Sequence, residues 1–85
     1  MNIKDKTYYI KYYDNYDKDR ESYNIWYIDN EYAYIVATKY KNDVRAKNKH
    51  NKRWGSLKRL KGYLRDINYK NIEELSKADV FLELL

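Results

Sequence analysis

The chain contains no cysteine and no proline, and its 85 residues include only one histidine and two glycines. Without cysteine, neither a disulfide nor a thiolate metal site can support the fold. One histidine without cysteine also lacks the usual ligand set for zinc. Gly55 and Gly62 are too few and too far apart for a phosphate-binding loop or a dinucleotide-binding turn. We therefore expect no metal and no cofactor.

Long apolar runs are absent as well. No stretch approaches the roughly 20 apolar residues that a membrane-spanning helix needs. The first residues, Met1–Tyr9, lack the apolar segment and the small-residue cleavage site of a secretory signal. These absences predict a protein that does not insert into membranes and that resides in the cytoplasm of its host cell.

The residues that are present predict a single globular domain over residues 1–85. Apolar residues make up 44% of the chain and aromatic residues 18%, which is more than a disordered segment contains. A chain of this length buries roughly 60–65% of its unfolded surface, so its stability is modest. Twelve of the fifteen aromatic residues are tyrosines, whose rings can pack while their hydroxyls reach water.

Charge is segregated along the chain. Residues 39–65 carry eleven cations and one anion, Asp43, whereas acidic residues outnumber basic ones on both sides of this segment. The net charge of the whole chain is +5. A dense block of like charge repels itself and destabilises a fold unless an outside partner neutralises it. The distribution therefore favours an anionic partner.

Three segments rich in aromatic and β-branched residues predict strands at about residues 6–14, 23–28 and 32–40. Asp29 and Asn30 tolerate left-handed backbone and predict a tight turn between the last two. Short connections between successive strands predict a three-stranded antiparallel sheet, a β-meander.

Residues 41–54 show no clean period and predict a basic loop. Ser56 then has the character of a helix N-cap, and a helix is predicted over about residues 56–67. One side of this helix is apolar, and another side holds Lys58, Lys61 and Arg65. The fold class is therefore α+β, with a meander followed by two C-terminal segments of which the first is an amphipathic helix.

The second C-terminal segment, residues 71–85, begins with Asn71 and Glu74 at the spacing of a capping box, which predicts a helical start. Its last six residues are apolar on nearly all sides and fit either a buried helix or a final strand. Both alternatives need a covering surface, which a second copy of the chain or another protein can provide. The residues predicted for this protein interface are Val80, Phe81, Leu84 and Leu85.

The strongest candidate site is the basic loop together with the helix that follows it. Cations neutralise phosphates, a tryptophan can stack on a base, and a helix N-terminus favours phosphate. His50, the one histidine, has no neighbouring carboxylate to orient it and is interpreted as a phosphate contact or a solvated residue. The residues predicted to bind nucleic acid or a nucleoprotein complex are Lys47, Lys49, His50, Lys52, Arg53, Trp54, Lys58, Arg59, Lys61 and Arg65.

Two further hypotheses remain open beside a non-enzymatic nucleic-acid binder. In one, the chain is a small ribonuclease that uses His50, because the RNA 2′-hydroxyl serves as an internal nucleophile. In the other, the C-terminal apolar segment and the tyrosine-rich sheet dock on a protein, and the positive charge only keeps the chain soluble.

The chain also resembles two kinds of small protein. Its size and basic charge are similar to those of ribonuclease toxins of toxin–antitoxin pairs, although the order of sheet and helices differs. Its short length, biased composition and missing catalytic set resemble small phage-encoded anti-defence proteins, of which anti-CRISPR proteins are the best-known kind. The second resemblance concerns the length and composition of the whole chain and rests on no motif. It implies inhibition of a bacterial nucleic-acid-handling enzyme by binding, and it assigns no role to any residue.

Overall fold

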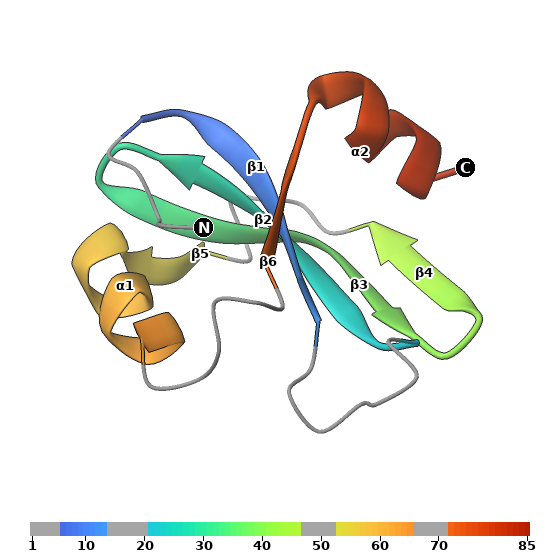
Figure 1. The fold of residues 1–85 in the computed structure, drawn as a ribbon, viewed down its shortest axis with the longest axis horizontal. Helices are drawn as coiled ribbons and strands as arrows, with labels where there is room; N and C mark the ends of the chain where they lie inside the picture. Colours follow the sequence, from blue (N-terminus) through green and yellow to red (C-terminus); the bar gives the residue numbers. More distant parts are fainter. Residues whose placement is uncertain (1–5, 14–20, 47–52, 66–71) are drawn as a thin grey trace.

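The computed structural model describes residues 6–13, 21–46, 53–65 and 72–85. These residues form one six-stranded antiparallel sheet with two short helices (Figure 1). The elements, in chain order, are β1 (Tyr8–Tyr13), β2 (Tyr23–Asp29), β3 (Tyr32–Tyr40), β4 (Asp43–Ala46), β5 (Arg53–Ser56), α1 (Leu57–Arg65), β6 (Ile72–Leu75) and α2 (Lys77–Glu83).

The predicted α+β class and the antiparallel meander of the first three strands are confirmed. The predicted number of strands is wrong, because β4, β5 and β6 join the same sheet. The strand order is β4-β3-β2-β1-β6, and β5 also pairs with β3. The turn between β2 and β3 contains Asn30 with φ 37°, the left-handed backbone that the sequence predicted there.

Of the added strands, β4 lies inside the predicted basic loop of residues 41–54, and β5 begins in that loop and runs on to Ser56. Lys41, with φ 56°, reverses the chain so that β4 folds back on the end of β3. β5 pairs with Tyr32–Tyr34 at the start of β3. β2 occupies the other side of β3, so β4 and β5 lie one after the other along a single edge of the sheet.

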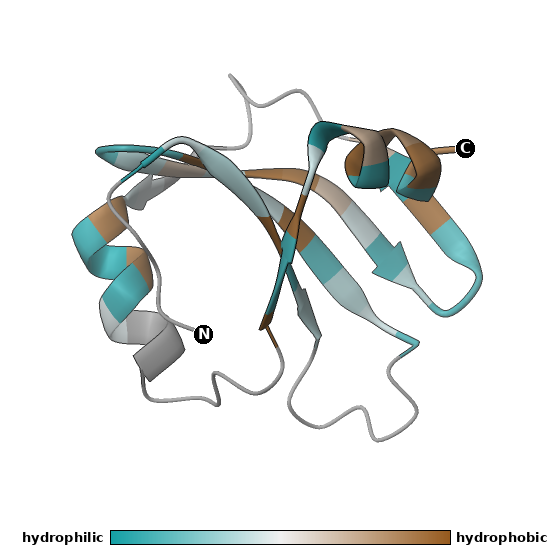
Figure 2. Ribbon diagram, turned by 45° about the horizontal axis from the view of Figure 1, so that its top comes forward, coloured by the Kyte–Doolittle hydropathy of each residue, from teal (hydrophilic) through white to brown (hydrophobic). Residues whose placement is uncertain are grey.

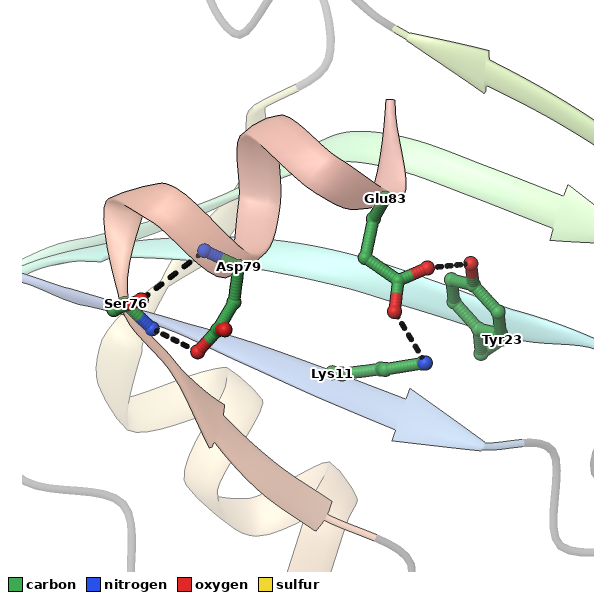
Figure 3. Close-up of polar contacts among 5 residues, drawn as sticks. All are labelled: Lys11, Tyr23, Ser76, Asp79 and Glu83. Carbon is green, nitrogen blue, oxygen red and sulfur yellow. Dashed lines mark hydrogen bonds and ion pairs between the residues drawn. The ribbon is translucent and has the colours of Figure 1, made fainter. Parts of the chain in front are cut away.

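The third added strand, β6, falls where a helical start was predicted. β6 pairs with β1, which has four buried residues out of six and whose outer backbone groups would otherwise lack partners. The capping box of the described residues is formed by Ser76 and Asp79. Glu74 lies in β6, and Asn71 lies outside the described residues. The Asp79 backbone N–H donates to Ser76 Oγ at 3.1 Å, and the Ser76 N–H donates to Asp79 Oδ2 at 3.0 Å (Figure 3). The latter bond lowers the pKa of Asp79.

The two helices pack against opposite faces of the sheet. Leu57 and Leu60 of α1 join a core with alternate residues of β1 and β2, including Ile10 and Trp26. Val80 of α2 joins a second core with residues of the opposite parity, including Ile25. Because successive side chains of a strand point to opposite faces, these two cores lie on different sides. The helices also lie at opposite ends of the sheet (Figure 1).

Candidate nucleic-acid interface

The edge of the sheet formed by β4 and β5 belongs to the basic part of the sequence. Lys41 and Arg45 are exposed in the β3–β4 hairpin. β5 leads directly from Arg53 into α1, whose Lys58 and Arg59 are exposed. The pairing of both strands with β3 therefore places described basic residues at both ends of one sheet edge.

The amphipathic character of α1 is confirmed for the side chains that the structure describes. Leu57 and Leu60 are buried, while Lys58 and Arg59 are exposed and Lys61 is half-buried. Arg53 and Trp54 lie in β5 and Arg65 ends α1, but the positions of their side chains are not among those described. The predicted site residues Lys47, Lys49, His50 and Lys52 lie outside the described residues.

The N-terminus of α1 is already engaged within the fold. The Leu57 N–H donates to the carbonyl oxygen of Glu31 at 2.6 Å, and the Arg59 N–H donates to Ser56 Oγ at 3.2 Å. Ser56 thus caps the helix as the sequence predicted. Since these bonds use two of the first three N–H groups of α1, the basic side chains have to supply most of the attraction for a phosphate there.

Beside this helix end lies an open depression of about 410 Å³, lined by Asn30, Glu31, Ser56, Leu57, Lys58 and Lys61. Glu31 places one negative charge next to the two lysines. In the hairpin at the other end of the edge, Arg45 Nε lies 2.7 Å from Asp43 Oδ2. Asp43 is the one acidic residue among residues 39–65. This segment therefore has ten more cations than anions.

Of the four residues predicted for the protein interface, the structure buries one and exposes three. Val80 is buried in the core and is not part of an exposed surface. Phe81, Leu84 and Leu85 are exposed, and Leu82 is exposed with them. Figure 2 shows α2 and the chain end coloured largely as hydrophobic. We call Phe81, Leu82, Leu84 and Leu85 the C-terminal apolar patch.

A charged cluster that the sequence analysis missed attaches α2 to the sheet (Figure 3). Lys11 of β1 places its Nζ 2.7 Å from Glu83 Oε1, and the Tyr23 hydroxyl donates to Glu83 Oε2. The Lys11 ammonium also lies 4.2 Å from the centre of the Tyr23 ring. Lysine in the middle of an aromatic strand was the available signal, but its partner is distant in sequence.

The ionisation of this cluster points to a structural role. Burial opposes the charged form of Lys11, but its hydrogen bonds to Glu83 and Tyr13 and the negative charge of Glu83 together outweigh this and raise the pKa of Lys11 to about 12. Burial and the bond to Glu83 raise the pKa of Tyr23 to about 12. Burial opposes ionisation of Glu83, but its bonds to Lys11 and Tyr23 prevail and lower its pKa. Lys11 therefore stays protonated near pH 7 and is a poor base or nucleophile.

Among the described residues, no three histidine, cysteine, aspartate or glutamate side chains are grouped so that they could hold a metal ion. In the same part of the chain, no helix has the length and apolar character needed to span a membrane. Comparison with known proteins yields no matching family model, no matching curated protein and no matching solved structure.

Proposed function

We propose that this protein is a non-enzymatic binder of nucleic acid, free or within a nucleoprotein complex. It binds through α1 and through the sheet edge formed by β4 and β5, which we call the basic edge. The observation that carries the proposal is the placement of exposed Lys41, Arg45, Lys58 and Arg59 at the two ends of the β4–β5 edge. Phosphate neutralisation by such cations releases counterions and supplies affinity without sequence readout.

The chemistry of the described residues supports binding more than catalysis. Lys11 and Tyr23, whose pKa values are raised to about 12, both donate to Glu83 on the face that α2 covers. On the basic edge, lysine and arginine side chains are suited to phosphate contact. The resemblance to anti-defence proteins implies an inhibitor of a bacterial defence nuclease. Such an inhibitor would bind the nucleic acid held by the nuclease through the same surface.

Salt dependence tests this proposal. If four to six cations contact phosphates, log affinity should fall with log salt at a slope of about −3 to −5, at about 0.7–0.9 per contact. Changing Lys58, Lys61 and Arg65 to glutamine should make that slope shallower by about 2–3 units. The three positions are spaced along one side of α1, away from Leu57 and Leu60. Fluorescence anisotropy on single-stranded and duplex oligonucleotides measures both effects.

A matched control separates this surface from net charge. Changing Lys4, Lys18 and Lys70 to glutamine removes the same charge outside residues 39–65 and should alter the slope by less than about 1 unit. Glu31→Gln removes the acid beside Lys58 and Lys61 and should strengthen binding. Absence of wild-type binding at low salt, or equal effects of the two triple variants, would contradict the proposal.

The ribonuclease alternative makes its own prediction through His50. A binder should keep its affinity for RNA within about twofold after His50→Ala, because one phosphate contact among several contributes little at moderate salt. The wild-type chain should also leave a labelled RNA intact. RNA cleavage that His50→Ala abolishes, in a variant with an unchanged circular dichroism spectrum, would establish the enzyme instead.

The C-terminal apolar patch favours a second candidate function, a protein-docking module. Four neighbouring large apolar residues lie exposed at one end of the molecule, a feature typical of protein interaction sites. We propose a second copy of the chain as the occupant, because two such patches meeting face to face cover each other. The test, which uses adjacent residues of α2, is given in the Discussion.

A further inference from the structure

Three tyrosines form a row across the sheet on the face opposite α1. Tyr9 of β1 is the register partner of Tyr27 of β2, and Tyr27 is the partner of Tyr34 of β3. The ring centres of Tyr9 and Tyr27 lie 5.0 Å apart, and those of Tyr27 and Tyr34 lie 6.1 Å apart. We call Tyr9, Tyr27 and Tyr34 the tyrosine row.

The tyrosine row is only partly used by the fold. All three residues are half-buried. Tyr9 packs beside the core under α2, whereas Tyr27 and Tyr34 belong to neither core cluster of the described residues. Helix α2 sits on the same face but is anchored further along the strands, at Lys11 and Tyr23. Part of each of these three tyrosine residues therefore remains accessible to solvent.

The surroundings of the row match an anionic ligand with flat, apolar groups. At the β1–β6 end lies an open depression of about 490 Å³, whose lining includes Lys6, Tyr9, Tyr27, Glu74 and Lys77. Lys6 pairs with Glu74 at 3.4 Å, and Lys77 is an exposed cation at the start of α2. At the other end of the row, Tyr34 is the register partner of Arg53, the first residue of β5 on the basic edge.

We propose that the tyrosine row stacks on unpaired bases, so that the nucleic acid this protein prefers is single-stranded. This inference rests on the proposed nucleic-acid binding and adds a second surface to it. Aromatic side chains stack on base faces, which a duplex hides between neighbouring base pairs. Strands about 4.8 Å apart make a row long enough for two or three bases. The phosphates then lie near Lys77 and the basic edge.

The Tyr27→Leu/Tyr34→Leu variant tests this assignment, because leucine keeps an apolar side chain on the strand and removes the aromatic face. Stacking contributes about 1–3 kcal/mol per base, so affinity for single-stranded DNA should fall at least tenfold. Duplex affinity should stay within about twofold. Tyr27→Phe/Tyr34→Phe keeps the rings and should bind single strands within about threefold of wild type.

The outcomes separate this inference from the proposed function. If the wild type binds single and double strands and the leucine variant keeps their affinity ratio, the row does not stack on bases but the proposed function stands. If the wild type binds neither, both fail. If the phenylalanine variant loses as much affinity as the leucine variant, hydroxyl bonding and not stacking is responsible.

Crosslinking of the wild type tests the same contact without any variant, in case the leucine variant unfolds. A single-stranded oligonucleotide containing 5-bromouracil is bound to the protein and irradiated, and crosslinked peptides are mapped. Crosslinks at Tyr9, Tyr27 or Tyr34 support the inference. Crosslinks confined to residues 39–65 overturn it.

Discussion

Replacing Glu83 with alanine is expected to lower the free energy of unfolding by about 2 kcal/mol, a large part of the stability of a chain this short. The change leaves the Lys11 ammonium, whose side chain is only 11% exposed, without its carboxylate. It also removes the acceptor of the Tyr23 hydroxyl. The Glu83 side chain is itself 27% exposed, so solvent screening keeps the loss below the 3–5 kcal/mol of a fully buried pair.

Glu74→Ala is the matched control for this loss. Glu74 also pairs with a lysine of the N-terminal part of the chain, Lys6, but both side chains are well exposed and the pair is longer, at 3.4 Å. Such a surface pair contributes about 0–1 kcal/mol. Urea unfolding followed by circular dichroism measures both variants. Equal losses would show that the Glu83 cluster does not hold α2 on the sheet.

The same cluster predicts how stability depends on pH. The pKa of Glu83 is lower in the folded state, so its contribution is present above the unfolded value of about 4.3 and is lost as pH falls through the folded value. The pKa values of Lys11 and Tyr23 are raised to about 12, so their contributions are present below pH 10 and are lost between about pH 10 and 12.

Thermal melts from pH 3 to pH 11 should therefore show a plateau of stability with a loss at each end. In Glu83→Ala the acid loss should shrink, because the carboxylate that titrates there is gone. The alkaline loss should also shrink, because Lys11 and Tyr23 lose the bonds to Glu83 that help to hold their folded-state pKa values above the unfolded ones. An unchanged pH profile in the variant would contradict the assignment.

The central strands of the fold could be predicted because their signals are local. β1, β2 and β3 are rich in aromatic and β-branched residues, and Asn30 marks the turn between the last two. β4 and β6 are four-residue strands that form because a neighbouring strand offers an unpaired edge. Glu73 and Glu74 at the centre of β6 carry no strand preference, so only the need of β1 for a partner places them in the sheet.

The candidate site was predictable to a similar extent. The side chains of α1 follow a helical period, so exposed Lys58 and buried Leu60 could be assigned from spacing. The tyrosine row depends on the register between β1, β2 and β3, which the sequence does not specify without the observed pairing. The bond between Lys11 and Glu83 joins residues at opposite ends of the chain, and no local pattern indicates it.

Substitutions at two adjacent residues of α2 are expected to have different large effects, on stability at Val80 and on self-association at Phe81. Val80 is 8% exposed and packs with Tyr23, Ile25 and Ala37, whereas Phe81 is 65% exposed. Val80→Asp puts a carboxylate into this core and should lower the free energy of unfolding by more than about 3 kcal/mol. Phe81→Asp should change the stability of the monomer by less than about 0.5 kcal/mol, because its side chain already faces water.

Self-association should respond in the opposite way. If a second copy covers the C-terminal apolar patch, the wild type should dimerise as its concentration rises, and Phe81→Asp should stay monomeric because each dimer would bury two carboxylates. Phe81→Leu, which keeps the patch apolar, should dimerise within about tenfold of the wild-type constant. Sedimentation velocity over a hundredfold range of concentration measures this. A wild type that stays monomeric throughout, or a Phe81→Asp variant that dimerises equally well, would show that the patch does not bind a second copy.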